Sequence, residues 1–149
     1  MIAHGVPGLD IQQTHLLPAP SDAVFAALTL GIDTWWPRSY RLTSGRLSLL
    51  PALGASLSEA GPEGKAASWG VVDLIEPGRR LYLSGWFGVP GVVMGRVHFD
   101  LQPEGPGTRL TLLHQAIGPV SEDRVSVHRA RWREVLGGAL PAYLAGTPV

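Results

Sequence analysis

The sequence contains no cysteine, and this absence removes three kinds of chemistry. Without a thiol the chain has no disulfide framework, no cysteine nucleophile and no thiolate metal site. It also carries little charge: twelve basic and twelve acidic side chains cancel, and charged residues make up only 16% of the chain. A protein that binds nucleic acid or the surface of an anionic membrane needs a basic face. The balance therefore argues against both classes of partner.

Patterns typical of metal and nucleotide sites are also missing. The five histidines include no helical i, i+4 pair with a glutamate, which is the spacing of a common zinc site. Glycine-rich phosphate loops, nucleophile elbows and paired carboxylates at recognisable spacing are absent as well. We therefore expect no metal and no cofactor, and the sequence assigns no catalytic residue.

Long hydrophobic runs are absent too. The first twenty residues contain no lysine, no arginine and no apolar run of seven residues, which predicts neither a secretory signal nor a transmembrane span. The expected location is the cytoplasm. The length of 149 residues predicts a single domain over 1–149 with its core at about 10–145, and residues 1–8 form an irregular leader. Monomer and homodimer are both compatible with the sequence.

The chain does contain a series of short extended runs separated by proline and glycine. Apolar residues alternate with polar ones in these runs, which is typical of antiparallel strands joined by turns. No crossover helix separates the later runs, so parallel pairing is not expected. The predicted strands are 9–17, 46–50, 55–59, 67–75, 81–87, 92–102 and 108–115.

Two helices are predicted around these strands. Residues 21–28 form a short one, whereas 29–43 shows no clear secondary structure. Residues 121–144 form one long helix without a break, because Ser121 can cap it and apolar residues then recur every three or four positions. Its mid-helix pair Gly137-Gly138 costs about 1 kcal/mol per glycine relative to alanine. We therefore expect a close approach of the sheet backbone there, or alternatively a kink.

Together these elements predict an α+β fold in which a curved antiparallel sheet of about six or seven strands is closed by the C-terminal helix. A sheet that grips a helix often leaves an apolar cavity, and such cavities bind small molecules.

Four stretches follow one another along the chain: 19–28 with Trp35-Trp36-Pro37, 70–81 with Trp86, 107–114, and the terminal helix with Trp132 and Leu136. Their order resembles the SRPBCC superfamily, and within it the branch of homologues of the heat-shock-protein-90 ATPase activator. The similarity covers roughly residues 10–145, and it departs from the family pattern at 50–55, where a basic residue and a glycine pair are common.

The resemblance implies a helix-grip fold, with two short helices between the first and second strands. Ligand-binding members of the superfamily use the cavity between sheet and helix for lipids, steroids, polyketides or other apolar molecules. Some relatives catalyse cyclisation or hydration there, and others only bind. The branch has no universal catalytic signature, and its co-chaperone name does not transfer an activity by fold alone.

Periodicity selects candidate cavity residues. Alternation puts Leu112 and His114 on one face of their strand. If that face is concave, His114 points into the cavity and could donate to a ligand or act as acid or base; the alternative is a core histidine bonded to one carbonyl. On the helix, Arg129 could receive a carboxylate or enolate, or else form a surface ion pair, whereas Arg131 is expected to point elsewhere.

Tryptophan is abundant, with five residues against three phenylalanines. An indole offers a wide apolar face and one donor, which suits a flat ligand, although core packing is its commoner use. We expect Trp86 and Trp132 to line the cavity and Trp35-Trp36 to lie near its mouth. The full set of expected cavity residues is Trp35, Trp36, Trp86, Phe99, Leu112, His114, Arg129, Trp132 and Leu136.

Three functions follow from this reading. The leading hypothesis is a container that sequesters a small apolar or amphipathic molecule. The second is an enzyme of the cyclase, dehydratase or hydrolase kind that uses His114, and a carboxylate or tyrosine beside His114 would favour it. The third is a chaperone-linked protein-interaction module that uses a sheet face or edge, and a filled, dry interior would favour it.

Overall fold

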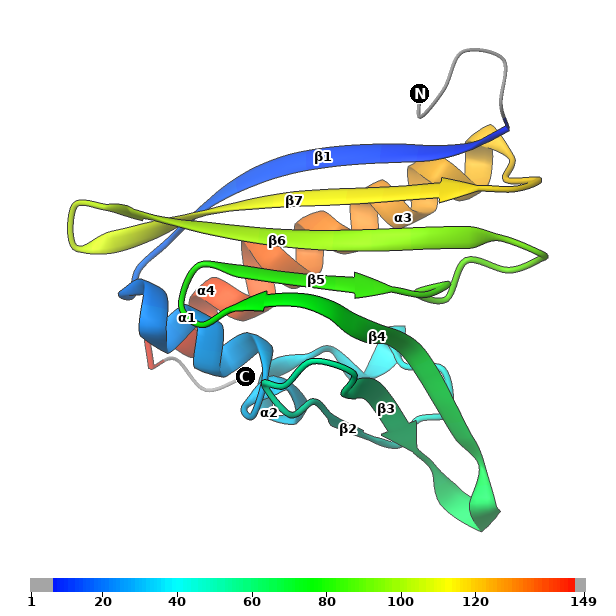
Figure 1. Ribbon diagram of the computed structural model, residues 1–149, viewed down its shortest axis with the longest axis horizontal. Helices are drawn as coiled ribbons and strands as arrows, with labels where there is room; N and C mark the ends of the chain where they lie inside the picture. The colour runs from blue at the N-terminus through cyan, green and yellow to red at the C-terminus, as the bar shows by residue number, and fades with distance from the viewer. Residues whose placement is uncertain (1–6, 147–149) are drawn as a thin grey trace.

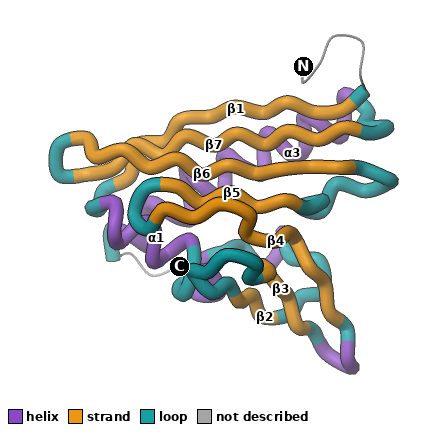
Figure 2. The backbone as a smooth tube through the Cα atoms, viewed as in Figure 1, coloured by secondary structure: helices purple, strands orange, loops and turns teal. Residues whose placement is uncertain are grey.

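The computed structural model describes residues 7–146, so most of the leader expected over residues 1–8 lies outside the described part. Seven antiparallel strands form one sheet, and helices cover one of its faces (Figures 1 and 2). The strands are β1 (Gly8–Leu17), β2 (Arg46–Ser48), β3 (Ser56–Ala60), β4 (Ala66–Glu76), β5 (Arg80–Ser84), β6 (Met94–Glu104) and β7 (Gly107–Ile117). The helical segments are α1 (Ser21–Leu28), α2 (Ile32–Trp35), η1 (Arg38–Tyr40), η2 (Pro62–Gly64), α3 (Glu122–Glu134), η3 (Val135–Ala139) and α4 (Leu140–Leu144).

The sheet has the order β1-β7-β6-β5-β4-β3-β2. Every strand after β1 pairs with its neighbours in sequence, and β1 pairs with β7 from Gly8↔Ile117 to Leu17↔Thr108. The register shifts within β3 and again within β4, and such bulges bend a sheet. β4 bends strongly along its length in Figure 1. The curved sheet of the predicted helix-grip fold, with two short helices after the first strand, is therefore confirmed.

The C-terminal helix lies across the concave face of the sheet (Figure 1). The alternation predicted for β7 is observed, because Leu110, Leu112 and His114 are all buried at 0% exposure. Leu136 and Leu140 of the helix are buried to the same degree and belong to the same core. The predicted cap is also present, since the Ser121 hydroxyl accepts a hydrogen bond from the amide of Arg124 at 3.2 Å.

The helix differs from the expectation at its glycine pair. The helical run continues through residues 122–144, but Val135–Ala139 is a π-helical turn between α3 and α4. Pro141 follows it, and proline has no amide hydrogen to donate to the carbonyl four residues earlier. The expected approach of sheet backbone is wrong, because the group that faces Gly137 is the His15 side chain of β1. A Cβ at Gly137 would lie 3.1 Å from His15 Nδ1.

Two segments depart from the predicted elements. The strand expected over 81–87 ends at Ser84, so Trp86 and Phe87 lie in the turn that follows, where Phe87 has a φ of 46°. The segment 29–43, for which the sequence indicates no structure, contains α2 and η1. Both departures lie beside the candidate site.

Candidate functional site

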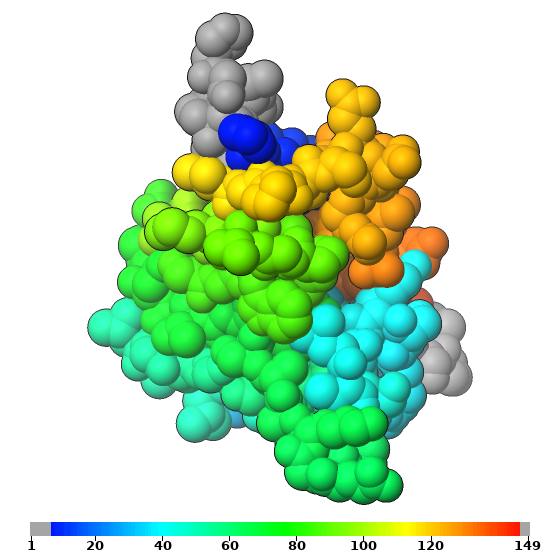
Figure 3. Space-filling model, turned by 90° about the vertical axis from the view of Figure 1, so that its right-hand side faces the viewer, coloured from blue at the N-terminus to red at the C-terminus, as the bar shows by residue number. Residues whose placement is uncertain are grey.

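A partly enclosed pocket lies between the η1 segment, the end of β5 and the C-terminal helix. Its volume is about 130 Å³. In the space-filling view the segment around η1, in cyan, adjoins both the helix, in orange, and the region after β5, in green (Figure 3). The residues that line the pocket are Trp36, Ser39, Tyr40, Arg41, Leu42, Trp69, Phe87, Gly88, His128, Arg131, Trp132 and Val135.

Four aromatic rings form the apolar walls. Trp36 packs edge-on against Trp69 at 5.7 Å and against Trp132 at 5.9 Å between ring centroids. Phe87 lies 6.0 Å from Trp69 and 6.2 Å from Trp132, which closes the ring of contacts. Gly70 makes room for this arrangement, because a Cβ there would lie 2.8 Å from the Phe87 ring. The four rings therefore support one another around the pocket.

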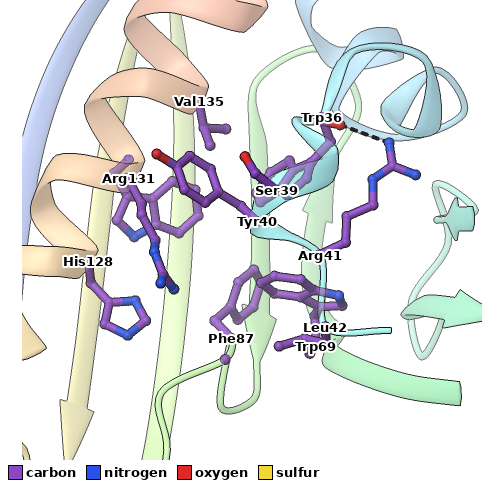
Figure 4. Close-up of a pocket in the computed structure, with 12 residues that line it drawn as sticks. Trp36, Ser39, Tyr40, Arg41, Leu42, Trp69, Phe87, His128, Arg131 and Val135 are labelled. Atoms are coloured by element: carbon purple, nitrogen blue, oxygen red, sulfur yellow. Dashed lines mark hydrogen bonds between the residues drawn. The ribbon is translucent and has the colours of Figure 1, made fainter. Parts of the chain in front are cut away.

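A buried arginine shapes the segment that carries η1. Arg41 Nη1 donates to Asp33 Oδ1 at 2.7 Å and to the carbonyl of Gly45 at 2.8 Å. Its Nη2 donates to the carbonyls of Asp33 at 2.9 Å and Trp36 at 2.8 Å. Figure 4 shows the Arg41 side chain directed away from Tyr40, with its bond to the Trp36 oxygen dashed. This guanidinium holds the loop and is not directed toward a ligand.

A buried carboxylate holds the other end of the same segment. Glu59, 1% exposed, faces the interior from β3. Its Oε1 accepts hydrogen bonds from the amide of Leu42 at 2.9 Å and from Trp69 Nε1 at 3.2 Å. Its Oε2 accepts from the amide and hydroxyl of Thr43 and from the amide of Gly45. Burial alone would raise the pKa of this carboxyl, but the hydrogen bonds outweigh it and lower the pKa to about 2. Glu59 is therefore charged at neutral pH.

Three residues that line the pocket have a buried nitrogen without a partner. Among the described residues, Trp36 Nε1, Arg41 Nε and His128 Nε2 are buried and have no hydrogen-bond partner. Arg131 is half-buried, forms no ion pair within residues 7–146, and places its guanidinium 5.3 Å from the centre of the Tyr40 ring. The Tyr40 hydroxyl donates to Oε2 of Glu134, and Glu134 itself is not among the residues that line the pocket. Figure 4 shows Arg131 and His128 pointing from the helix toward the side of the pocket that carries Phe87.

Two neutral histidines lie at and behind the pocket. Burial, and then the charges of Arg131 and Arg124, lower the pKa of His128 to about 4. His114 lies behind the aromatic wall, where its Nδ1 accepts a 3.0 Å hydrogen bond from Trp132 Nε1. Burial, and then the nearby His128, lower its pKa to about 3. Since Nδ1 is an acceptor, the ring proton of His114 is on Nε2, which has no partner among the described residues.

The expected cavity residues fall into three groups. Trp36 and Trp132 line the pocket. A second group is buried in the core beside or beneath it: Trp35, Phe99, Leu112, His114 and Leu136. The third group lies outside it. Trp86 is 39% exposed and its Nε1 donates to the carbonyl of Ser68. Arg129 adjoins β1, since its carbonyl accepts a 2.9 Å hydrogen bond from Gln13 Nε2.

The expectation that Arg131 points elsewhere is wrong. The η1 segment packs against the side of the helix, so the pocket is lined by the helical face that contains His128, Arg131, Trp132 and Val135. These positions have the i, i+3, i+4, i+7 spacing of one helical face. The sequence prediction followed the apolar stripe toward the sheet, in which either His128 or Arg129 could take part, and it chose Arg129 as the cavity residue in place of His128 and Arg131.

Other wall residues were missed for want of a signal. Tyr40 and Leu42 come from the segment without periodicity, and Phe87 comes from a turn. Trp69 lies on β4 and is 5% exposed, but strict alternation does not place it on the buried face, because Trp69 and Gly70 are buried in succession where the register shifts against β3.

Neither a metal cluster nor a membrane helix is found in the described part of the chain. Within residues 7–146, no group of three histidine, aspartate or glutamate side chains could hold a metal ion. No helix in that range is both long and apolar enough to cross a membrane.

Comparisons with known proteins identify relatives of this fold. The family model described as "Activator of Hsp90 ATPase homolog 1-like protein" matches residues 18–145. No curated protein gives a significant match.

Several solved structures are similar. Protein MLL2253 from Mesorhizobium loti superposes with a TM-score of 0.71 at 18% identity, over 94% of this chain and 99% of that one. CalU16 from Micromonospora echinospora gives 0.66 at 26% identity, over 100% and 82%. DynU16, a protein in the dynemicin biosynthetic locus, gives 0.68 at 25% identity; the match covers 95% of this chain and 49% of DynU16.

Proposed function

Since the chain belongs to the family of Activator of Hsp90 ATPase homolog 1-like proteins, a helix-grip branch of the SRPBCC superfamily, we propose that it binds a small apolar or amphipathic molecule. The binding site is the aromatic pocket between η1, the end of β5 and α3. The observation that carries the proposal is a space walled by four aromatic rings, where two buried nitrogens, Trp36 Nε1 and His128 Nε2, have no hydrogen-bond partner within residues 7–146.

The energetics of these nitrogens support the proposal. A buried donor or acceptor without a partner costs about 1–3 kcal/mol. A molecule that enters the pocket and accepts a hydrogen bond from the Trp36 indole recovers part of that cost and also covers the faces of Trp36 and Trp132. Binding would therefore gain from both hydrogen bonding and apolar contact.

The size of the pocket limits the ligand. A volume of about 130 Å³ lies below the roughly 300–1,000 Å³ of sites for drug-sized molecules. It approaches the roughly 150 Å³ of an engineered cavity that binds benzene. The proposed ligand is therefore about as large as one six-membered ring with short substituents. The 25% identity to DynU16, whose locus is biosynthetic, supports a small molecule over a macromolecular partner.

No specific observation favours an enzyme. Within residues 7–146 the hydrogen bond of the His114 side chain is to Trp132, and no carboxylate or tyrosine bonds to it. A pKa of about 3 is also far from the value that suits a general acid or base at neutral pH. The proposal is thus sequestration, by a single-domain cytoplasmic protein that acts as a monomer or homodimer.

The first test is native mass spectrometry of the protein purified without added ligand, followed by extraction of any adduct. The second is a titration of ¹⁵N-labelled protein with toluene, a neutral one-ring probe. We expect saturable shifts of the indole N–H signals of Trp36 and Trp132. Trp35 and Trp86 serve as internal controls, because neither lines the pocket. Equal, non-saturating shifts at all indoles, together with an adduct-free mass, would overturn the proposal.

A further inference from the structure

The side-chain chemistry of the pocket narrows the ligand class. We propose that the pocket selects aromatic carboxylates of one ring, and that Arg131 receives the carboxylate while the ring lies among the indoles. This inference rests on the function proposed above and adds to it a charge and a polar anchor.

The polar side chains at the pocket favour an anion. The twelve lining residues include no aspartate and no glutamate. The nearest acid on the helix, Glu134, is bonded to the Tyr40 hydroxyl. Arg131 and Trp36 instead bring N–H groups to the walls, and within residues 7–146 the buried Trp36 Nε1 has no hydrogen-bond partner. A carboxylate supplies two acceptor oxygens and no competing donor, so it complements this set.

Arg131 is placed to be the anchor. It is half-buried, it makes no ion pair within residues 7–146, and the face of the Tyr40 ring lies 5.3 Å from its Cζ. This stacking restricts the orientation of the guanidinium before a ligand arrives. Its charge also reaches His128, since it helps to lower the pKa of that imidazole. The second arginine at the pocket, Arg41, is unsuitable because four hydrogen bonds to its own loop occupy its Nη atoms.

The walls limit what the carboxylate is attached to. The four aromatic side chains that form the walls are each no more than 6% exposed, and their rings enclose the apolar part of a space of about 130 Å³. They are Trp36, Trp69, Phe87 and Trp132. A flat ring fits between indoles with offset or edge contacts, whereas a long acyl chain does not fit in that volume. One ring and one carboxylate therefore use the aromatic walls and the cation together.

The test compares three probes of similar size: benzoate, its neutral isostere benzamide, and toluene. Affinities come from the indole N–H shifts of Trp36 and Trp132 at constant pH and ionic strength. We expect the native protein to bind benzoate at least tenfold more tightly than benzamide, because a bidentate guanidinium contact is worth that factor or more. This comparison requires no variant, so a folding defect cannot obscure it.

Two matched variants then assign the anchor. Arg131→Met keeps an unbranched stem and removes the charge, and we expect it to lose at least tenfold in benzoate affinity with toluene binding within twofold of native. Arg129→Met removes a charge from the same helix outside the pocket, and it should change neither affinity. Arg131→Lys should restore part of the benzoate preference, since it returns the charge without the planar fork.

The outcomes separate the two proposals. If benzoate and benzamide bind equally well, or if Arg131→Met retains the benzoate preference, the carboxylate inference is wrong and binding of a small apolar molecule stands. If none of the three probes produces a saturable shift at Trp36 or Trp132, both proposals are overturned. If Arg129→Met loses as much benzoate affinity as Arg131→Met, the benzoate preference arises from general surface charge. That result would also refute the role of Arg131 as the carboxylate anchor.

Discussion

Replacement of Glu59 by glutamine should lower the stability of the fold at neutral pH and make it less sensitive to acid. In the native protein the carboxylate accepts hydrogen bonds from three backbone amides, the hydroxyl of Thr43 and the indole of Trp69. A glutamine side chain keeps one acceptor oxygen and places an NH₂ group against donors at the other position. Because hydrogen bonds to a charged group contribute about 1.5–3 kcal/mol each, we expect a loss of roughly 2–4 kcal/mol near pH 7.

The pH dependence has a definite sign. The folded-state pKa of Glu59 is depressed from 4.5 to about 2, so folding favours the ionised form. The stabilisation is fully present above pH 4.5 and is lost as the pH falls from about 4.5 through 2. A shift of this size corresponds to roughly 3 kcal/mol at 1.36 kcal/mol per pKa unit. The native protein should lose that amount in this window, whereas the Glu59→Gln variant lacks this titration.

The assay is urea unfolding at pH 7, 5, 4 and 3, followed by tryptophan fluorescence. The expected result is a stability difference between native and Glu59→Gln protein that shrinks as the pH falls below 5. Glu63→Gln is the matched control, because Glu63 has an exposed side chain on the neighbouring η2 turn. A difference that stays constant from pH 7 to pH 3, or an equal pH trend in Glu63→Gln, would refute the reasoning.

Three further outcomes are expected in the C-terminal helix and the core. Gly138→Ala should raise the free energy of unfolding in urea by up to about 1 kcal/mol. Gly137→Ala should raise it less or lower it, because the new Cβ would lie 3.1 Å from the His15 ring. Trp132→Phe should cost about 1–3 kcal/mol by the same assay, because it leaves the buried Nδ1 of His114 without its donor. In ¹H–¹⁵N spectra the His114 imidazole should show no titration between pH 5 and 8, because burial lowers its pKa to about 3; a midpoint in that range would contradict the assigned environment.

The fold was accessible from the sequence because its signals are local and periodic. Alternation in residues 108–115 correctly places Leu112 and His114 on the buried face of β7. The Ser121 cap and the three-to-four spacing after it correctly predict the start of α3. The resemblance to the helix-grip branch carries the same order of elements and agrees with the family match over residues 18–145. The alternation and the cap each depend on neighbours within a few residues along the chain.

The pocket was less accessible because its walls meet only in three dimensions. Tyr40 lies on a segment with no hydrophobic period, and Phe87 lies where the chain leaves β5 with a positive φ of 46°. Arg131 lines the pocket because the η1 segment packs against the side of α3. No property of the helix sequence itself predicts this packing. Trp86 illustrates the converse error: a residue assigned to a strand by its neighbours lies in a turn, and its indole bonds to the carbonyl of Ser68.

The loop that builds the pocket depends on two buried charges as well as on the apolar burial of Trp35 and Trp36. Arg41 and Glu59 do not bond to each other; each is satisfied largely by backbone groups of the segment between Asp33 and Gly45. Removal of either partner from such a network leaves buried polar groups without bonds, which is costly. The same contacts fix Trp36 and Trp69, so the stability of the fold and the shape of the pocket are coupled. A ligand that binds the pocket should in turn stabilise this segment, by an amount that rises with its free concentration relative to Kd.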